Sequence, residues 1–336
     1  MKADGYGHGS DACAGAAIKG GATSLAVATA GEAEQIGRRF PHVPLLTMGA
    51  LTDTEVDVAL AAGSEIAVWR VEFLRHVAAR ARAQGSTARV HVKYDTGMGR
   101  LGTMDAEQVR ALVGICEQED DLRLRGVWTH FATADEPGDN FFAEQLDRFS
   151  PLAAELKSRH PEIILHAANS AALFRDPASH FDMARCGIAV YGLDPFGEDP
   201  AARGLEPALE LRSYVADVKR FAAGTSAGYG RTWSAPRDTQ VGVLPIGYGD
   251  GVRRGLSNNA EVLVRGRRHP LVGTVSMDNI TVDLGPDSDV VPGEEAVLIG
   301  AQDGERILAE ELARRLDTIN YEVTCGISQR VPRVHR

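Results

Sequence analysis

Short apolar runs alternate with longer amphipathic stretches over the first two thirds of the chain. The amphipathic stretches are rich in Ala, Glu and Arg, and their spacing predicts helices at 30–40, 71–84 and 106–118. Strands that alternate with helices indicate a parallel sheet with helices outside it. The short runs predict strands at Ser24–Ala28, Val43–Met48, Glu65–Trp69, Arg89–Tyr94, Leu124–His130, Ile163–Ala168 and Ala184–Tyr191.

The number of strands predicts a closed barrel. Seven strands can be counted, and Lys2 would lie at the end of an eighth whose beginning is cut short. Eight βα units form a (β/α)8 TIM barrel, whose active site lies where the strands end. Polar residues follow several of these strands at their carboxyl ends. Because the strands of a barrel end at the same face, these residues should converge on one mouth of the barrel. They are Lys93, His130, Asn169, Ser170 and Arg185.

The pattern of apolar runs and turn residues along the chain changes after about Gly204. Short β-rich runs separated by Gly, Pro and Asp follow, with one late helix at Ala309–Leu316, and they predict a mainly β domain. We therefore expect a barrel domain over residues 1–204 and a C-terminal β domain over residues 205–336. The strands expected in the second domain are Val215–Val218, Gln240–Ile246, Glu261–Val264, Leu271–Val275, Asn279–Leu284 and Glu295–Ile299.

Charge and cysteine usage narrow the class of protein. The formal net charge of -10 argues against a surface for nucleic acid or an anionic membrane. No run of roughly 18 apolar residues predicts a membrane span. The four cysteines are far apart and form no C-x-x-C pair, which is typical of reduced thiols in a cytoplasmic protein. The chain begins abruptly at its first motif, so we expect that upstream sequence is missing.

Motif scanning excludes two common kinds of site. The chain has no G-x-x-x-x-G-K-[ST] and no H-E-x-x-H, so neither a P-loop nor a common zinc site is expected. At the start, Lys2 precedes the glycine-rich turn Gly5-Tyr6-Gly7. A lysine amine can form a Schiff base with an aldehyde, and glycines let the backbone approach a phosphate closely. The Tyr6 hydroxyl offers a donor to such a phosphate.

Longer motifs resemble those of bacterial alanine racemases, and they keep their order from the first residue nearly to the last. The matching segments are KADGYGHG at 2–9, HVKYDTGMGRLG at 91–102, WTHFATAD at 128–135, ANS at 168–170, MARCGIAVYG at 183–192, GYG at 228–230, IGYGDG at 246–251, SMD at 276–278 and TINYEV at 318–323. The resemblance implies a barrel that binds pyridoxal 5'-phosphate (PLP), a mainly β C-terminal domain and a homodimer with shared active sites. It implies an isomerase that interconverts L-alanine and D-alanine and supplies D-alanine for peptidoglycan.

The resemblance also implies which residues hold the cofactor. Lys2 would hold PLP as a Schiff base, and Arg185 would face the pyridine nitrogen, with His130 against the ring. A guanidinium stays charged and leaves that nitrogen largely unprotonated, which weakens the ring as an electron sink. Further contacts would come from Arg100 and Asn169. The phosphate would be bound by Tyr6, Ser170, Gly187, Ile188 and Tyr321.

Racemisation needs proton exchange on both faces of Cα, and two bases on opposite faces achieve this. The resemblance implies Lys2 as the base for the D-enantiomer and Tyr229 of the other subunit for the L-enantiomer. Arg100 would bind the substrate carboxylate together with the Met277 backbone N–H from the partner chain. Lys93 would carry a carbamate that orients Arg100. The substrate access path would include Asp135, Tyr248 and Arg254, and no metal is implied.

Other interpretations stay open at this point. A racemase for serine, lysine or a broad range of amino acids would share the same residues, because pocket width cannot be judged from one chain. A decarboxylase of this shape would place an acidic residue where Arg185 stands. A PLP carrier without catalysis would resemble the barrel alone, and the abrupt start is compatible with a catalytically impaired fragment.

Overall fold

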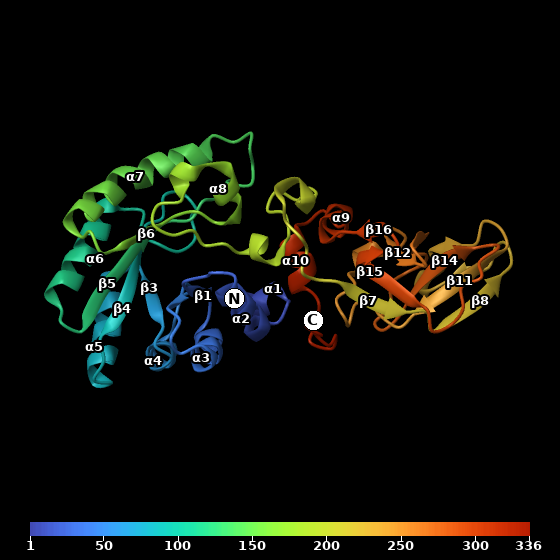
Figure 1. The fold of residues 1–336 in the computed structure, drawn as a ribbon, viewed down its shortest axis with the longest axis horizontal. Helices are drawn as coiled ribbons and strands as arrows, with labels where there is room; N and C mark the ends of the chain where they lie inside the picture. Colours follow the sequence, from blue (N-terminus) through green and yellow to red (C-terminus); the bar gives the residue numbers. More distant parts are fainter. The chain divides into compact units, whose positions relative to one another are not determined.

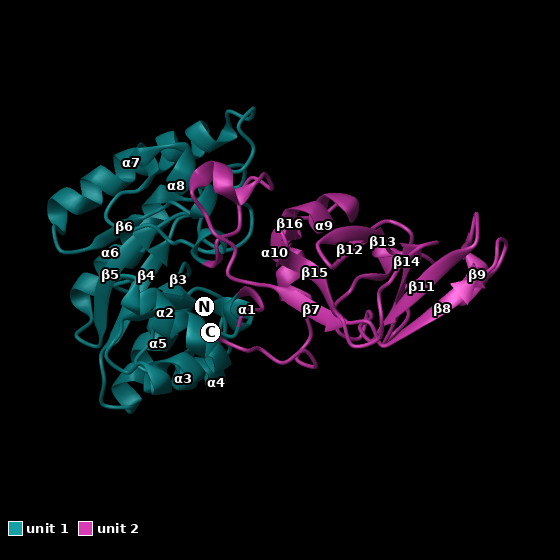
Figure 2. Ribbon diagram, turned by 45° about the vertical axis from the view of Figure 1, so that its right-hand side comes forward, with its two compact units in different colours: residues 1–5, 9–190 teal, residues 6–8, 191–336 magenta.

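The computed structural model describes all of residues 1–336. The chain forms two compact units, coloured separately in Figure 2. The first comprises Met1–Gly5 and Gly9–Val190, and the second comprises Tyr6–His8 and Tyr191–Arg336. The domain boundary expected between residues 204 and 205 from composition stays a prediction.

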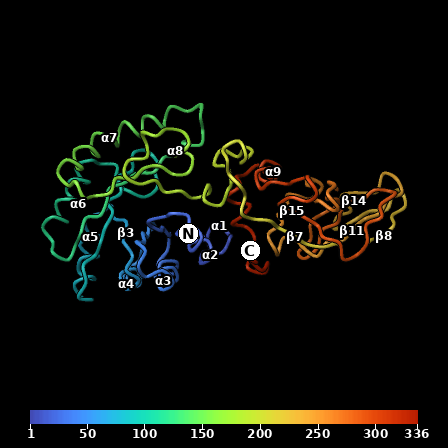
Figure 3. Tube along the Cα trace, in the orientation of Figure 1, coloured from blue at the N-terminus to red at the C-terminus, as the bar shows by residue number.

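The first unit contains a curled sheet of six parallel strands in the order β1-β2-β3-β4-β5-β6. Figure 1 shows helices α3 to α7 along the outer side of this sheet, and the trace in Figure 3 follows the same alternation from blue to green. The strands are β1 (Leu25–Val27), β2 (Leu45–Thr47), β3 (Glu65–Val68), β4 (Ala88–Lys93), β5 (Leu122–Trp128) and β6 (Ile164–His166). The helices are α1 (Lys2–Tyr6), α2 (Ser10–Lys19), α3 (Ala30–Arg39), α4 (Asp53–Ala61), α5 (Val71–Ala83), α6 (Ala106–Gln118), α7 (Phe141–Arg159), α8 (Ser170–Arg175) and the 3-10 turn η1 (Pro177–Ser179).

Burial explains why the strands of this unit are continuous apolar runs. Every residue of β3 is buried, as expected for a parallel strand covered on both faces. Near β1, Leu25, Val27 and Leu45 form a core cluster with Ile36 of α3. The parallel sheet with helices outside it, predicted from the alternating pattern, is confirmed as a half-barrel.

The predicted strand Ala184–Tyr191 is wrong. Residues 184–187 have no regular structure, and the 3-10 turn η2 (Ile188–Tyr191) follows them. The Arg185 N–H donates to Ala168 O at 2.9 Å, but the Gly187 N–H turns to the Ser170 side chain instead of a neighbouring strand. Side-chain capture of the Gly187 N–H thus ends the pairing, and the only backbone bond that precedes that of Arg185 along this side is that of the Asp182 N–H to Leu165 O at 3.0 Å.

The second unit is built from antiparallel sheets. One has the order β14-β11-β8, another has the order β13-β12-β15-β16 with β7 paired to β15, and β9 pairs with β10. Burial alternates along β14, as in a sheet with one face on the core. The strands are β7 (Leu211–Tyr214), β8 (Asp217–Phe221), β9 (Ser226–Ala227), β10 (Trp233–Ser234), β11 (Thr239–Leu244), β12 (Glu261–Val264), β13 (Arg267–Pro270), β14 (Ile280–Gly285), β15 (Glu295–Gln302) and β16 (Glu305–Ile307). The helical segments are η3 (Pro200–Arg203), η4 (Tyr229–Arg231), η5 (Arg254–Leu256), α9 (Ala309–Arg315) and α10 (Asn320–Cys325).

Two predicted strands of this unit are misplaced. The structure ends β7 before Val215 and begins β8 at Asp217, so the run 215–218 straddles a break between strands. In the run 271–275, only Leu271 forms a bridge, to Val282, and the strand lies earlier as β13. The mainly β character of the unit is confirmed. None of the helices in the chain combines the length and hydrophobicity needed to cross a membrane.

Candidate active site

Lys2 begins a turn of unusual handedness. Ala3, Asp4, Gly5 and Tyr6 have φ angles of 50°, 51°, 62° and 56°, so four consecutive residues adopt the left-handed conformation. The Gly5 N–H donates to Met1 O at 2.9 Å and closes the turn. Left-handed backbone costs an L-residue other than glycine roughly 1–2 kcal/mol. The chain therefore stores backbone strain directly beside Lys2.

The first turn of helix α3 holds this strained segment. Glu32 Oε1 accepts from the Ala3 N–H at 2.7 Å, while Oε2 accepts from Ala28 N at 2.8 Å and Thr29 N at 3.1 Å. Thr29 and Glu32 together form the capping box of α3. One carboxylate thus caps a helix and anchors the turn that carries Lys2.

Two predicted cations meet across an aromatic ring at the carboxyl edge of the sheet. Lys93 ends β4, and its Nζ lies 4.3 Å from the centroid of the Trp128 ring at the end of β5. The Arg185 Cζ lies 4.7 Å from the same ring. Lys93 is only 2% exposed, and burial, followed by the charges of Arg100 and Arg185, lowers its pKa to about 8. The ring face offsets part of the cost of burying these charges.

The Arg185 guanidinium is held entirely by neutral acceptors. It donates to His166 Nδ1 at 2.8 Å, Thr129 O at 2.8 Å and Ala167 O at 2.9 Å, and it approaches His130 Nδ1 at 3.3 Å. Burial lowers the pKa of Arg185 to about 9. The group therefore stays charged at neutral pH, and it has no carboxylate as partner.

His130 lies 3.3 Å from the Arg185 guanidinium and is acted on by other cations. Burial and the charges of four cations, namely Arg185, Arg100, Lys93 and Lys2, hold its pKa well below the usual range. The imidazole is therefore neutral near pH 7. So much positive charge around one neutral ring favours an anionic ligand that carries phosphate or carboxylate groups.

A loop wrapped around Asp95 carries Arg100. The Asp95 carboxylate accepts from Gly97 N at 3.0 Å, Gly99 N at 3.1 Å and Arg100 N at 3.0 Å. Burial acts to raise the pKa of Asp95, but these backbone donors outweigh it and hold the pKa below its usual value. Asp95 is not among the residues predicted from the sequence, although the D-T-G-M-G run signals such an aspartate-centred loop.

Three of the residues expected at the phosphate lie together at the start of α8. Ser170 Oγ accepts from Gly187 N at 2.8 Å and Ala189 N at 3.3 Å, and the buried Ile188 lies between these donors in sequence. Asn169 Oδ1 instead accepts from Ala172 N at 2.9 Å and caps α8. The structure thus gives the Asn169 side chain a role in fixing the helix.

The other two residues expected at the phosphate belong to an aromatic cluster in the second unit. The Tyr6 ring lies 5.1 Å from that of Tyr191 and 5.9 Å from that of Tyr321. Burial, followed by the charge of Cys325, raises the pKa of Tyr6 to about 12, which keeps its hydroxyl a neutral donor. A Cβ on Gly7 would lie 2.1 Å from Thr324 O, so only glycine fits there.

The residues expected from a partner chain lie on exposed loops of the second unit. Tyr229 is 72% exposed, and its carbonyl accepts from Thr274 Oγ1 at 2.8 Å. Met277 is 51% exposed, and its carbonyl accepts from Gly249 N at 2.9 Å. The Met277 N–H donates to no acceptor in this chain. Three residues of the expected access path are also exposed, namely Asp135 in the first unit and Tyr248 and Arg254 in the second.

Three polar residues inside the sheet are not among those predicted from the sequence. Glu65, His91 and His166 are buried and joined by hydrogen bonds, and His166 also accepts from Arg185. The available signal was a charged or imidazole side chain inside an otherwise apolar strand.

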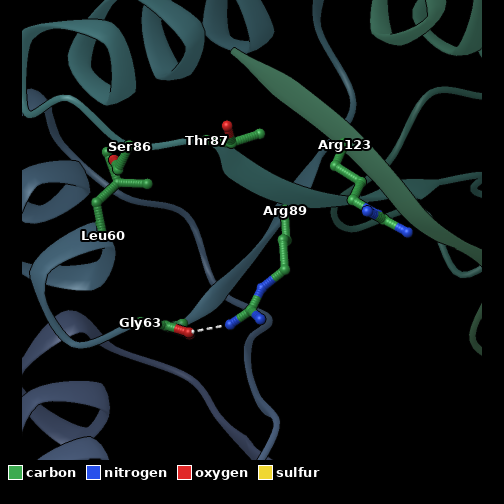
Figure 4. Close-up of a pocket in the computed structure, with 7 residues that line it drawn as sticks. Leu60, Gly63, Ser86, Thr87, Arg89 and Arg123 are labelled. Atoms are coloured by element: carbon green, nitrogen blue, oxygen red, sulfur yellow. Dashed lines mark hydrogen bonds between the residues drawn. The ribbon is translucent and has the colours of Figure 1, made fainter. Parts of the chain in front are cut away.

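A hollow of about 350 Å³ lies away from these groups. Its residues precede or begin strands β3, β4 and β5, whereas the candidate site lies where strands end. Figure 4 shows Arg89 pointing toward the Gly63 carbonyl, to which it donates at 2.7 Å. The hollow is lined by Leu60, Gly63, Ser64, Ser86, Thr87, Arg89 and Arg123.

Two family models together cover most of the chain. The model described as "Alanine racemase, N-terminal domain" matches residues 1–195, and that described as "Alanine racemase, C-terminal domain" matches residues 208–335.

Curated proteins and solved structures agree with this match. The chain is 44% identical to the alanine racemase of Symbiobacterium thermophilum, over 100% of this chain and 89% of that protein. It is 40% identical to alanine racemase 1 of Bacillus subtilis, over 99% of this chain and 85% of that protein. The crystal structure of alanine racemase from D-cycloserine producing Streptomyces lavendulae superposes with a TM-score of 0.95 at 36% identity, covering 100% of this chain and 89% of that one.

Proposed function

The chain belongs to the alanine racemase family of isomerases, and we propose that it interconverts L-alanine and D-alanine with PLP as cofactor. The observation that carries this proposal is the half-buried Arg185 guanidinium, held by neutral acceptors at the edge of the sheet beside His130. Four cations act on His130, which suits a cofactor that bears a phosphate and a substrate that bears a carboxylate. The residues present therefore fit PLP.

When bound, PLP would supply an aldehyde for Lys2 and a conjugated ring that delocalises the electron pair left at Cα. Arg185 would face the pyridine nitrogen as a donor that does not give up its proton near neutral pH. The Ser170 hydroxyl and the Gly187 and Ile188 N–H groups would bind the phosphate. The roles of Tyr6, Tyr321 and Asn169 at the cofactor rest on the family resemblance.

Proton transfer would use one base on each face of Cα. Lys2 would take and return the proton on the face presented by D-alanine, and Tyr229 of the second copy would do so on the face presented by L-alanine. The substrate carboxylate would be held by Arg100 and by the Met277 N–H of the second copy. The exposure of Tyr229 and Met277 supports a role in an assembly of two chains.

Lys93 would react with carbon dioxide. The neutral amine adds to the carbon atom, one proton is released, and the product is an anionic carbamate. A pKa of about 8 leaves a larger neutral fraction near neutral pH than an ordinary lysine has. The resulting anion would replace a repulsive pair of cations by an attractive one and would orient Arg100.

The proposed location, assembly and metabolic role of the protein rest on its family. We propose a cytoplasmic homodimer that supplies D-alanine for peptidoglycan, with Asp135, Tyr248 and Arg254 along the path by which substrate reaches the site. Serine and lysine are the rival substrates, because the same residues would act on them.

Borohydride reduction of the purified protein tests the proposal. We expect cofactor absorbance before reduction and, after it, a label that peptide mass spectrometry maps to Lys2, together with exchange of L- and D-alanine that exceeds that of serine or lysine. Lys2→Ala should abolish label and activity, while Lys19→Ala at the end of α2 serves as the matched control. A label on another residue would overturn the proposal, and a label on Lys2 without alanine turnover would assign another amino acid.

A further inference from the structure

A line of hydrogen bonds runs through the sheet from Arg185 to Glu65. Arg185 Nη1 lies 2.8 Å from His166 Nδ1, His166 Nε2 lies 2.9 Å from His91 Nδ1, and His91 Nε2 lies 2.6 Å from Glu65 Oε2. The three inner residues are at most 5% exposed. The line joins the carboxyl edge of the sheet to the first residue of β3.

Donor and acceptor chemistry fixes the direction of every bond in this line. Arginine has only donors, so His166 Nδ1 must accept. A neutral His166 then carries its proton on Nε2 and donates to His91 Nδ1, which must accept in turn. His91 is left with a proton on Nε2, which it donates to the Glu65 carboxylate. If His91 donated from Nδ1 instead, His166 would present a proton to the Arg185 donors.

The surroundings favour the same arrangement. Burial and the charge of Arg185 hold the pKa of His166 well below its usual range, so it stays neutral. Burial acts to raise the pKa of Glu65, but the hydrogen bond from His91 and the charges of Arg125 and Arg89 outweigh it and keep the carboxylate ionised. Arg125 Nε donates to Glu65 Oε1 at 3.2 Å.

The backbone of the neighbouring strand β5 leaves space for the hydrogen-bonded imidazole of His91. A Cβ on Gly126 would lie 2.5 Å from His91 Nδ1, so a larger residue would displace the imidazole. The pairing of β4 with β5 shifts register between Val90 and His91. The Trp128 ring stacks on His166 at 5.5 Å with an interplanar angle of 8°, which fixes the plane of that imidazole.

We propose that Glu65 is a positioning residue for Arg185, acting through His91 and His166. The carboxylate selects the tautomer of both imidazoles, and the second imidazole presents a lone pair that holds the guanidinium in place. Nitrogen-15 NMR of the cofactor-free protein labelled at histidine tests this without reference to activity. We expect unprotonated Nδ1 and protonated Nε2 for both His91 and His166, and a protonated His166 Nδ1 would overturn the proposal.

A substitution series tests the effect on the cofactor, and this part rests on the proposed function. Glu65→Leu removes the acceptor, so we expect protonation to appear at His91 Nδ1 and PLP affinity to fall about 10- to 100-fold, the loss expected for a hydrogen bond to a charged group. Glu65→Gln keeps one carbonyl acceptor and should restore most of the affinity. Ser64→Ala removes the hydroxyl that bonds Thr47 and the carbonyls of Leu45 and Glu65 but leaves the Glu65 carboxylate in place, so it should match the wild-type tautomers and PLP affinity.

The outcomes separate this inference from the proposed function. A folded Glu65→Leu protein with unchanged PLP affinity would overturn the positioning role. If Glu65→Leu does not fold, the tautomers of His91 and His166 in the wild-type protein test the proposal, and a protonated His166 Nδ1 overturns it. If the wild type itself binds no PLP, the proposed function fails, while the NMR spectra still test the direction of the hydrogen bonds.

Discussion

At the scale of single residues, the proposed role of Tyr229 as a base predicts a specific kinetic effect of its substitution. The equilibrium constant of racemisation is one, so Tyr229→Phe must lower kcat/KM equally in both directions. We expect a loss of about 100-fold or more, as for removal of a general base. Lys2 remains, so D-alanine should still exchange its Cα hydrogen with deuterated water without inversion, while exchange from L-alanine is lost.

Proton NMR of the two enantiomers measures these exchange rates separately. Tyr214→Phe is the matched control, because Tyr214 is exposed on β7 and has no proposed role. Equal residual exchange from both enantiomers in the Tyr229→Phe protein would contradict the assignment of one base to each face.

Burial of Lys93 predicts a pH dependence of stability. Its pKa falls from 10.5 to about 8 on folding, so below about pH 8 both states carry the charge and the folded state pays the full burial cost. As the pH rises from about 8 to about 10.5, the folded state loses the proton first and becomes more stable, by at most about 3 kcal/mol. Lys93→Met should remove this contribution, while Arg185, whose pKa burial lowers to about 9, keeps its own rise above about pH 9.

Denaturant unfolding of the cofactor-free protein across this pH range, in buffer free of carbon dioxide, measures the effect. Lys19→Met, at the exposed end of α2, should retain the wild-type slope. If Lys93→Met retained that slope too, the rise would have to come from another group.

At the scale of elements, Glu32 links helix α3 to the turn after Lys2. Glu32→Ala removes the acceptor for three backbone N–H groups and should cost about 1–2 kcal/mol of stability, as for loss of a helix cap. Because the turn is strained, we also expect weaker retention of PLP on Lys2. Glu34→Ala on the same helix removes only an exposed pair with Arg38 and should change neither quantity.

Thermal unfolding and equilibrium dialysis of PLP measure the two effects. Loss of stability with unchanged PLP retention would show that the cap matters to α3 alone.

The elements also show what the sequence could predict. Amphipathic spacing predicts helices α3, α5 and α6, and short apolar runs predict strands β1 to β6, because each of these elements buries one face or both. The segment 184–191 looks equally apolar, but the Ser170 hydroxyl captures its N–H groups, and such a long-range contact leaves no periodic signal. Helix α7 contains Pro151, which argues against a helix on local grounds, yet the helix continues through it.

Some residues of the candidate site could likewise be predicted from the sequence, and others could not. Lys93, His130, Ser170 and Arg185 could be picked out because they stand where apolar runs end. Glu65, His91 and His166 lie within such runs, and only the successive pairing of four strands, β3 to β6, brings them into hydrogen-bonding distance.

At the scale of the whole molecule, the proposed sharing of active sites between two chains predicts complementation between two inactive variants. In a hybrid dimer of Lys2→Ala and Tyr229→Phe, one site would have both native bases and the other neither. Random mixing makes half of the dimers hybrid, so about a quarter of wild-type activity should return. Unmixed samples of each variant are the controls. No recovery after verified subunit exchange would place both bases in the same chain.

The left-handed turn after Lys2 has a stereochemical consequence. Ala3 has φ 50° and ψ 50°, the mirror image of the conformation that L-residues prefer in helices. A D-alanine at this exposed position keeps the methyl group and the freedom of the unfolded chain, and it should stabilise the fold by about 1–2 kcal/mol. A synthetic peptide of residues 1–12 ligated at Cys13 would allow the exchange, and denaturant unfolding would measure it. The backbone beside the proposed catalytic lysine is thus better suited to the enantiomer that we propose the enzyme makes.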